Sequence, residues 1–219
     1  MLILSLLSCI DASATPPEDV AASMHSRFAA LTAARDHVIG GRLAEAHSSG
    51  AALRASTESA PSDPTWARWL ARLGKDADRI ASARDLAQAA LGVGVAAQTC
   101  GECHAAQQGG PPLTGADGIP TQSWSEGTNM ALHRWSMDWM WVGLVAHDDA
   151  AWLRGAKSLD DKPLAFRFQG TPPPTHQPQL EQGVYMIAGL AIAAPAAERG
   201  ALMGQLIGTC AQCHAERGE

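Results

Sequence analysis

The sequence predicts an all-α protein made of two tandem four-helix bundles. The first observation is composition: the 219 residues are rich in Ala and Leu but include only 15 Val and Ile, three Phe and one Tyr. This balance favours helices, because β-branched and aromatic residues are enriched in strands. The second is a helical periodicity in eight successive segments, and the third is a cysteine motif that closes both the fourth and the eighth. The length allows one domain or two domains of about 100 residues each.

Four helices are predicted before the end of the first cysteine motif. The first follows two prolines, begins with the acids at 18–19, and is ended by the glycine pair at 40–41. A second covers about 42–57, a third begins at Pro64, which suits a first helical turn, and a fourth starts near residue 83. The spacing of apolar residues in the first helix predicts one buried stripe, consisting of Val20, Met24, Phe28, Leu31 and Val38.

The second half repeats this order of helices. Segments beginning near residues 126, 148, 179 and 195 have helical patterns, and the last runs into the second cysteine motif. An offset of 106 superposes Met24 on Met130 and Leu31 on Met137, and the offset has grown to 110 at the cysteine motifs. Because order and spacing recur, we expect a duplicated four-helix unit. The predicted domains are 15–107 and 125–219, joined by a linker at 108–124.

The N-terminal segment 1–14 predicts export to the periplasm, through either of two signals. Ala12-Ser13-Ala14 has the small-x-small form of a signal-peptidase site, whereas Leu6–Cys9 resembles a lipobox that would make Cys9 a lipidated N-terminus and a lipid anchor. The rest of the chain has no apolar run of the roughly 18–20 residues that a membrane-spanning helix needs. The formal charge of -6 and the lack of a Lys/Arg cluster in the sequence predict no nucleic-acid surface.

The two cysteine motifs have the form CxxCH. They consist of Cys100, Cys103 and His104, and of Cys210, Cys213 and His214. On a helix these spacings place both thiols and the imidazole on one side. Two thiols can then add to the two vinyl groups of one haem while the imidazole coordinates its iron, which is the attachment pattern of haem c. The sequence therefore predicts two covalently bound haem c groups, with His104 and His214 as the proximal iron ligands.

Three other uses of paired cysteines compete with haem attachment. A zinc site with four thiolates would require both motifs to meet in space. A thioredoxin-like redox pair expects a βαβ context that the helical pattern lacks. Disulfides inside each motif would close very short loops and stabilise little. Two motifs at matching positions of a duplicated helical unit favour haem over each of these.

The placement of the motifs resembles the cytochrome c prime family, in which a four-helix bundle carries CxxCH at its C-terminal end. The resemblance covers about 17–107 and 126–217 and is carried by the two CxxCH motifs and the helix count. It implies an all-α fold with one covalently attached haem c in each bundle. It also implies that the iron is often left five-coordinate. The tandem arrangement departs from the usual single-haem member of that family.

Candidate sixth ligands lie in the first helix of each half. In an up-and-down bundle the first and last helices are antiparallel neighbours, so the early turns of the first face the late turns of the last. Met24 and Met130 occupy those early turns at equivalent positions, and His25 and His133 are the alternatives. A Met on an apolar stripe is also ordinary core filler. An open distal face is the remaining option.

The predicted function is electron transfer between redox proteins, one a donor and the other an acceptor, in the periplasm. Six-coordinate iron suits this role, and Met ligation would raise the potential relative to two histidines. The alternative is a protein that binds nitric oxide or carbon monoxide at an open distal site. An enzyme such as a dihaem peroxidase is disfavoured, because the sequence offers no distal acid–base group. Arg27 and Arg134 are candidates for pairing with haem propionates.

Overall fold

The computed structural model describes residues 18–58, 64–110, 126–160 and 178–217, and these residues are almost entirely helical. They contain no β-strand, which confirms the predicted all-α class. The helices of the first half are α1 (Glu18–Ile39), α2 (Leu43–Glu58), α3 (Pro64–Ala81) and α4 (Leu86–Ala106). Those of the second half are α5 (Glu126–Ala146), α6 (Asp149–Asp160), α7 (Pro178–Ala193), the short 3-10 helix η1 (Ala196–Glu198) and α8 (Arg199–Arg217).

Most predicted helix ends lie within one or two residues of the observed ones, but α4 begins at Leu86 rather than near 83, and α8 begins at Arg199, after η1, rather than near 195. α1 ends before Gly41, which has a φ of 71°. Glycine adopts this left-handed conformation with little steric strain because it has no side chain. The side chain of Asp85 accepts a hydrogen bond of 2.8 Å from the Gln88 amide and caps α4. Asp148 does the same for the Ala151 amide at the start of α6, also at 2.8 Å. Such N-caps satisfy amides that have no partner within the helix.

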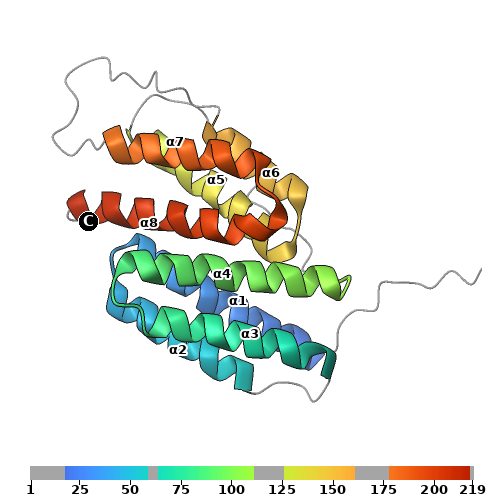
Figure 1. The fold of residues 1–219 in the computed structure, drawn as a ribbon. Coiled ribbons are helices and arrows are strands. Elements are labelled where there is room, and N and C mark those ends of the chain that lie inside the picture. The colour runs from blue at the N-terminus through green and yellow to red at the C-terminus, as the bar shows by residue number, and fades with distance from the viewer. Residues whose placement is uncertain (1–17, 59–63, 111–125, 161–177, 218–219) are drawn as a thin grey trace, which may run out of the picture.

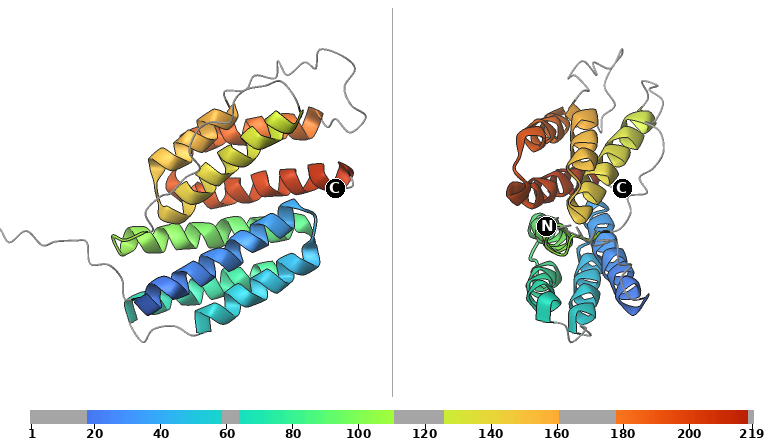
Figure 2. Two further views of the ribbon diagram at one scale, coloured as in Figure 1. Left: turned by 180° about the vertical axis from the view of Figure 1, so that it is seen from behind. Right: turned by 90° about the vertical axis from the view of Figure 1, so that its right-hand side faces the viewer.

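The two halves of the chain form adjoining groups of helices (Figure 1). Within each half, every helix packs against the next one along the chain, and the last helix returns to contact the first. The most extensive helix–helix contact of the molecule joins the halves and lies between α4 and α8, in the middle of the structure (Figures 1 and 2). One cluster of buried apolar residues extends through both halves. Most of the predicted linker lies outside the described residues.

The contact between α4 and α8 is antiparallel and passes through glycines. Gln98 bonds to Gly200, whereas Ala90 and Leu91, about two turns earlier in α4, lie against Gly204, one turn later in α8. A Cβ atom added to Gly94 would lie 2.6 Å from the Gly204 amide nitrogen. The two helix backbones can approach this closely only because glycine has no side chain there. Gly94 and Gly204 differ by 110, the offset between the cysteine motifs, so equivalent positions meet as in an isologous dimer.

Burial along α1 and α5 supports the offset of 106. Leu31, Ala34 and Val38 are buried in α1, and their counterparts in α5 are buried as well: Met137, Met140 and Leu144. One member of the predicted stripe is misplaced. Phe28 is 39% exposed, and Arg27 takes the buried position beside it with 7% exposure. The apolar periodicity alone assigned the stripe, and it did not reveal that the face toward α4 includes a buried cation.

None of the helices in the described part of the chain is long and apolar enough to cross a membrane. The predicted signal segment 1–14, with the lipidation candidate Cys9, lies outside the described residues.

Replacing Gly94 with Ala should destabilise the protein by about 1–3 kcal/mol, because the new methyl group would overpack the α4–α8 crossing. Chemical denaturation of the purified protein would measure this change. Gly183→Ala in α7 is the matched control, since the nearest atom to its added Cβ is 3.7 Å away, at Thr209 Cγ2. That substitution should be neutral or stabilise by about 0.5–1 kcal/mol through helix propensity. Equal effects at both positions would contradict the proposed tight crossing.

Candidate functional site

Each CxxCH motif lies in the last turns of its half's final helix. Cys100, Cys103 and His104 belong to α4, and the corresponding residues of the second motif belong to α8. All six side chains are half-buried. None of the four cysteines forms a disulfide with another described residue. Helical spacing therefore presents two thiols and an imidazole together on one side of each helix.

The antiparallel crossing places the two motifs at opposite ends of the α4–α8 pair. Cys103 follows Gly94 by nine residues, and Cys213 follows Gly204 by nine. With a rise of 1.5 Å per residue, the motifs are about 27 Å apart along the helix axes. The four thiols thus cannot meet in a single zinc site of the four-thiolate kind. Among the described residues, no group of three or more Cys, His, Asp or Glu side chains could hold a metal ion.

Arg27 of α1 lies beside the thiols of the first motif. Its Nη2 atom donates a hydrogen bond of 2.9 Å to the Ser56 carbonyl of α2, which holds the side chain in the interior. Burial lowers the pKa of Arg27, and the nearby Cys100 and Cys103 oppose that effect. A guanidinium stays protonated even when buried, so the first motif has a fixed positive charge next to it.

Burial also keeps the thiols of Cys100, Cys103 and Cys210 protonated. It raises the pKa of Cys100 to about 12, with a further contribution from the neighbouring Cys103, and it raises the pKa of Cys210 to about 12 in the same way beside Cys213. The pKa of Cys103 is also raised by burial, although Arg68 and Arg27 partly counter this. Because thiolates are the reactive and metal-binding form of cysteine, these thiols are poorly suited to redox exchange or zinc binding at neutral pH.

His104 is oriented by the other half of the molecule. Its Nδ1 atom is 2.7 Å from the carbonyl oxygen of Val145, near the end of α5. A carbonyl can only accept, so Nδ1 carries the proton and Nε2 is left as the ligating nitrogen. Burial lowers the pKa of His104, which favours the neutral imidazole that binds metals. The close approach of α5 depends on Gly101, since an added Cβ there would collide with the Leu144 carbonyl.

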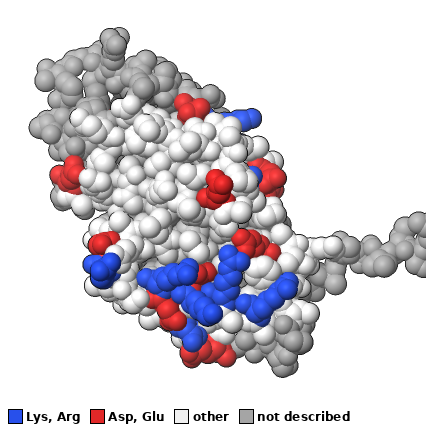
Figure 3. All heavy atoms as spheres, viewed as in Figure 1, with Lys and Arg blue, Asp and Glu red and all other residues white. Residues whose placement is uncertain are grey.

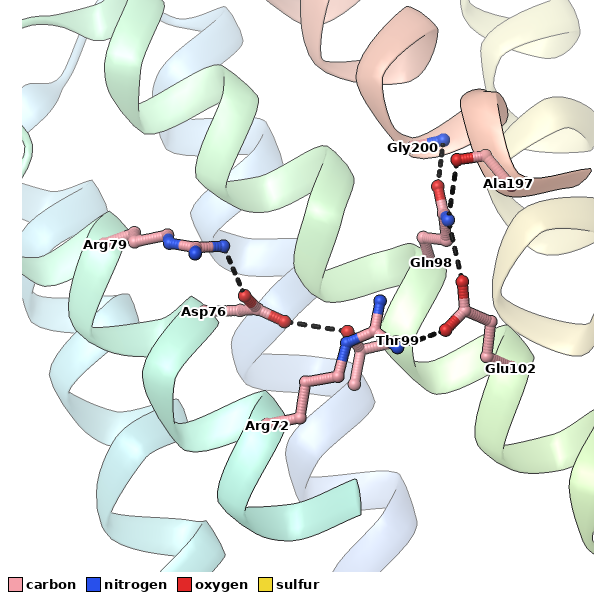
Figure 4. A network of polar contacts seen from close by, with 8 residues as sticks. All are labelled: Arg72, Asp76, Arg79, Gln98, Thr99, Glu102, Ala197 and Gly200. Atoms are coloured by element: carbon pink, nitrogen blue, oxygen red, sulfur yellow. Dashed lines mark hydrogen bonds and ion pairs between the residues drawn. The ribbon is translucent and has the colours of Figure 1, made fainter. Parts of the chain in front are cut away.

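Polar contacts fix the first motif to α3 (Figure 4). Asp76 is only 2% exposed. Its carboxylate accepts hydrogen bonds from the hydroxyl of Thr99 at 2.7 Å and from Arg79 at 2.8 Å. Thr99 directly precedes the first cysteine, and Glu102, inside the motif, pairs with Arg72. Sequence reasoning did not identify Asp76, because its role depends on a partner 23 residues away.

Gln98 connects the first motif to the second half. Its amide nitrogen donates to Glu102 at 2.7 Å and to the Ala197 carbonyl at 2.9 Å. Its amide oxygen accepts from the Gly200 backbone N–H at 2.7 Å, as Figure 4 shows. That N–H belongs to the first turn of α8, where backbone donors have no partner within the helix. One side chain next to the first motif therefore caps the helix that carries the second.

Helices α5 and α7 of the second half carry a different set of polar side chains. His133 of α5 packs edge-on against Tyr185 of α7, with ring centroids 5.9 Å apart, and the Tyr185 hydroxyl donates to Glu181 at 3.0 Å. Burial lowers the pKa of His133, while Glu181 acts in the opposite direction. The Nε2 atom of His133 is buried without a hydrogen-bond partner among the described residues.

The predicted distal residues occupy different environments. Met24 and Met130 are half-buried, as their shared position in the duplication implies. His25 is exposed. Its position is two before Arg27, which faces the first motif. His25 therefore points to roughly the opposite side of α1 from Arg27.

The surface near the first motif carries a basic stripe that the sequence reasoning missed. It consists of Arg68, Arg72, Lys75 and Arg79, four exposed residues of α3. Their spacings of four, three and four place them on one helix face. Arg68 and Lys75 form no ion pair with a described residue, whereas the other two pair with acids. Figure 3 shows basic side chains gathered over the first half of an otherwise acidic molecule. The stripe was missed because its members are not contiguous in sequence. Their helical spacing is the signal that could have revealed it.

Comparisons with known proteins found no matching family model, no matching curated protein and no matching solved structure.

The substitution Thr99→Val should destabilise the protein by about 1–3 kcal/mol, because it deprives the buried Asp76 carboxylate of a donor. The duplication supplies the control, Thr209→Val. The Thr209 hydroxyl bonds only to the Gln205 carbonyl of its own helix at an exposed site, so its loss should change stability by less than about 0.5 kcal/mol. Urea denaturation of both variants measures the difference. Equal losses would mean that the Asp76 contact does not stabilise the first motif.

Proposed function

We propose that this protein is a periplasmic dihaem c-type cytochrome that transfers electrons between redox partners. In this proposal each half is a four-helix bundle carrying one haem c on its CxxCH motif. The observation that carries it is the recurrence of two thiols and one imidazole, in the same last turns, at equivalent positions of a duplicated helical unit. Haem supplies the one-electron chemistry of its iron, and the chain supplies attachment, ligands and a shielded environment.

The residues present fit this group. Cys100 and Cys103 lie on one helix face as protonated thiols, and each S–H bond can add across a vinyl C=C bond, giving a thioether with no atom lost. His104 is neutral, and its Nδ1 hydrogen bond to Val145 leaves Nε2 for iron. Arg27, buried beside the same thiols, is suited to pair with a haem carboxylate.

The distance between the motifs favours two electrically independent haems. At about 27 Å, two unit charges interact by only about 0.2 kcal/mol in water. Exposed charges that far apart are screened further, since the Debye length is about 8 Å at physiological ionic strength. Each haem would then exchange electrons at its own end of the α4–α8 pair, with a potential set by its own ligands and neighbours.

Covalent haem is tested by the mass and colour of the protein after maturation. Expression with a haem c attachment system should give a red protein whose mass equals the chain plus two haems. The pair Cys100→Ser and Cys103→Ser should remove one haem, and Cys210→Ser with Cys213→Ser should remove the other. Electrospray mass spectrometry and the absorption spectrum report both losses. A colourless wild-type protein with the mass of the bare chain would refute the proposal.

Carbon monoxide distinguishes an electron carrier from a gas-binding protein. If both irons have two axial ligands, the reduced spectrum should not change rapidly when the gas is added. A fast shift of both haems would favour the gas-binding alternative.

The basic stripe on α3 should accelerate electron exchange with anionic partners at the first haem. Arg68→Glu combined with Lys75→Glu should slow oxidation of the reduced protein by hexacyanoferrate about 10-fold at low salt, because it reverses electrostatic steering. The effect should vanish near 1 M salt, where the Debye length is about 3 Å. Stopped-flow absorbance measures the rates. Lys157→Glu, at an exposed site on α6 in the second half, reverses one charge away from the stripe and so makes half the change in net charge. A slowing there half as large on a logarithmic scale would contradict a local docking role.

A further inference from the structure

We infer that His133 is the sixth ligand of the iron in the second haem, so that the two haems have different axial ligands. The inference rests on the proposed attachment of haem at Cys210 and Cys213. In this inference the iron is ligated by His133 rather than by Met130, which lies one turn earlier on the same helix.

The register of the duplication places His133 opposite the second motif. Arg27 is the α1 residue that lies beside the thiols of the first motif. An offset of 106 converts position 27 into position 133, and the same offset aligns the buried residues of α1 and α5 at three further places. Because the burial of both helices supports this register, His133 occupies in the second half the place that faces the thiols in the first.

Contacts from α7 locate His133 at the same end of the bundle as the second motif. The ring of His133 packs against Tyr185. Two residues before Tyr185, a Cβ added to Gly183 would lie 3.7 Å from Thr209, the residue that precedes Cys210. Gly183 and Tyr185 point to different sides of α7 but belong to one turn of it, so the imidazole and the start of the motif lie at the same level along the bundle.

The imidazole has a nitrogen that lacks a partner. Nε2 of His133 is buried and forms no hydrogen bond with a described residue. A buried polar atom without a partner is unfavourable, and a metal bond would satisfy it. The thioether of Met130 carries no comparable demand, because its sulfur packs in apolar surroundings without penalty.

The two haems would then differ in potential. The second would have two histidines, His214 and His133. The first cannot copy this arrangement, because Arg27 stands at the equivalent position and a guanidinium does not ligate. Its iron is left to Met24 or to an open site. A Met ligand raises the potential relative to a second histidine, and the positive charge of Arg27 favours reduced iron as well. The second haem would therefore be the more reducing of the two.

The test uses electron-paramagnetic resonance and carbon monoxide binding on the full-length holoprotein. Wild type should contain one low-spin haem with two histidine ligands. His133→Ala should convert half of the total haem iron to a high-spin form that binds carbon monoxide rapidly when reduced. Met130→Ala should leave that haem low-spin, and His25→Ala, at an exposed position of α1, should change neither haem.

His133→Met keeps the test decisive if the alanine variant does not fold. A thioether ligand at this position should preserve the low-spin state and raise the potential of one haem in a redox titration. The inference is overturned if wild type lacks a haem with two histidine ligands, or if His133→Ala leaves spin state and gas binding unchanged. It is equally overturned if His133→Met leaves both potentials unchanged. Failure of the proposed function looks different, because the wild-type protein would then contain no covalent haem.

Discussion

The close antiparallel contact of α4 with α8 is the constraint on which the rest of the structure depends. Gly94 and Gly204 allow two helix backbones to touch, and the remaining helices are arranged around that pair. The crossing sends the CxxCH motifs to opposite ends of the molecule. It also brings the end of α5 against the last turns of α4, where the Val145 carbonyl orients His104. The glycine-mediated crossing of α4 and α8 therefore sets the separation of the two CxxCH motifs. It also sets the tautomer of His104.

The two CxxCH motifs occupy the same place at the end of α4 and α8, but the polar side chains in the two halves differ. Around the first motif, the structure gathers charges: Arg27 in the interior, Asp76 beneath Thr99, and the basic stripe along α3. In the second half, a histidine and a tyrosine pack against each other between α5 and α7, and the tyrosine donates a hydrogen bond to Glu181. In the proposed dihaem cytochrome, the two halves share the order of helices and the CxxCH residues, while the side chains that would tune each haem differ. Such a difference would give the two haems different potentials.

Sequence reasoning succeeded where structure depends on neighbours along the chain. The start of α3 follows from Pro64 and the end of α1 from the glycines at 40–41, both of which are visible in the sequence. The prediction of buried residues from the sequence failed where an apolar side chain is exposed and a charged one is buried. Phe28 has the hydrophobicity of a core residue but is exposed, and Arg27 is buried, because the thiols and the Ser56 carbonyl surround that position.

By itself the sequence determined the helices and the arrangement of thiols and imidazole within each motif, because both arise from contacts within a few residues. Only the tertiary structure decided which residues surround each motif. The partner of His104 is 41 residues away, that of Thr99 is 23 away, and Gln98 bonds to a residue 102 away. A helical pattern does not encode such partners. They are selected when helices pack, and packing depends on side-chain volume summed over the whole core, including the two glycines that let α4 and α8 meet.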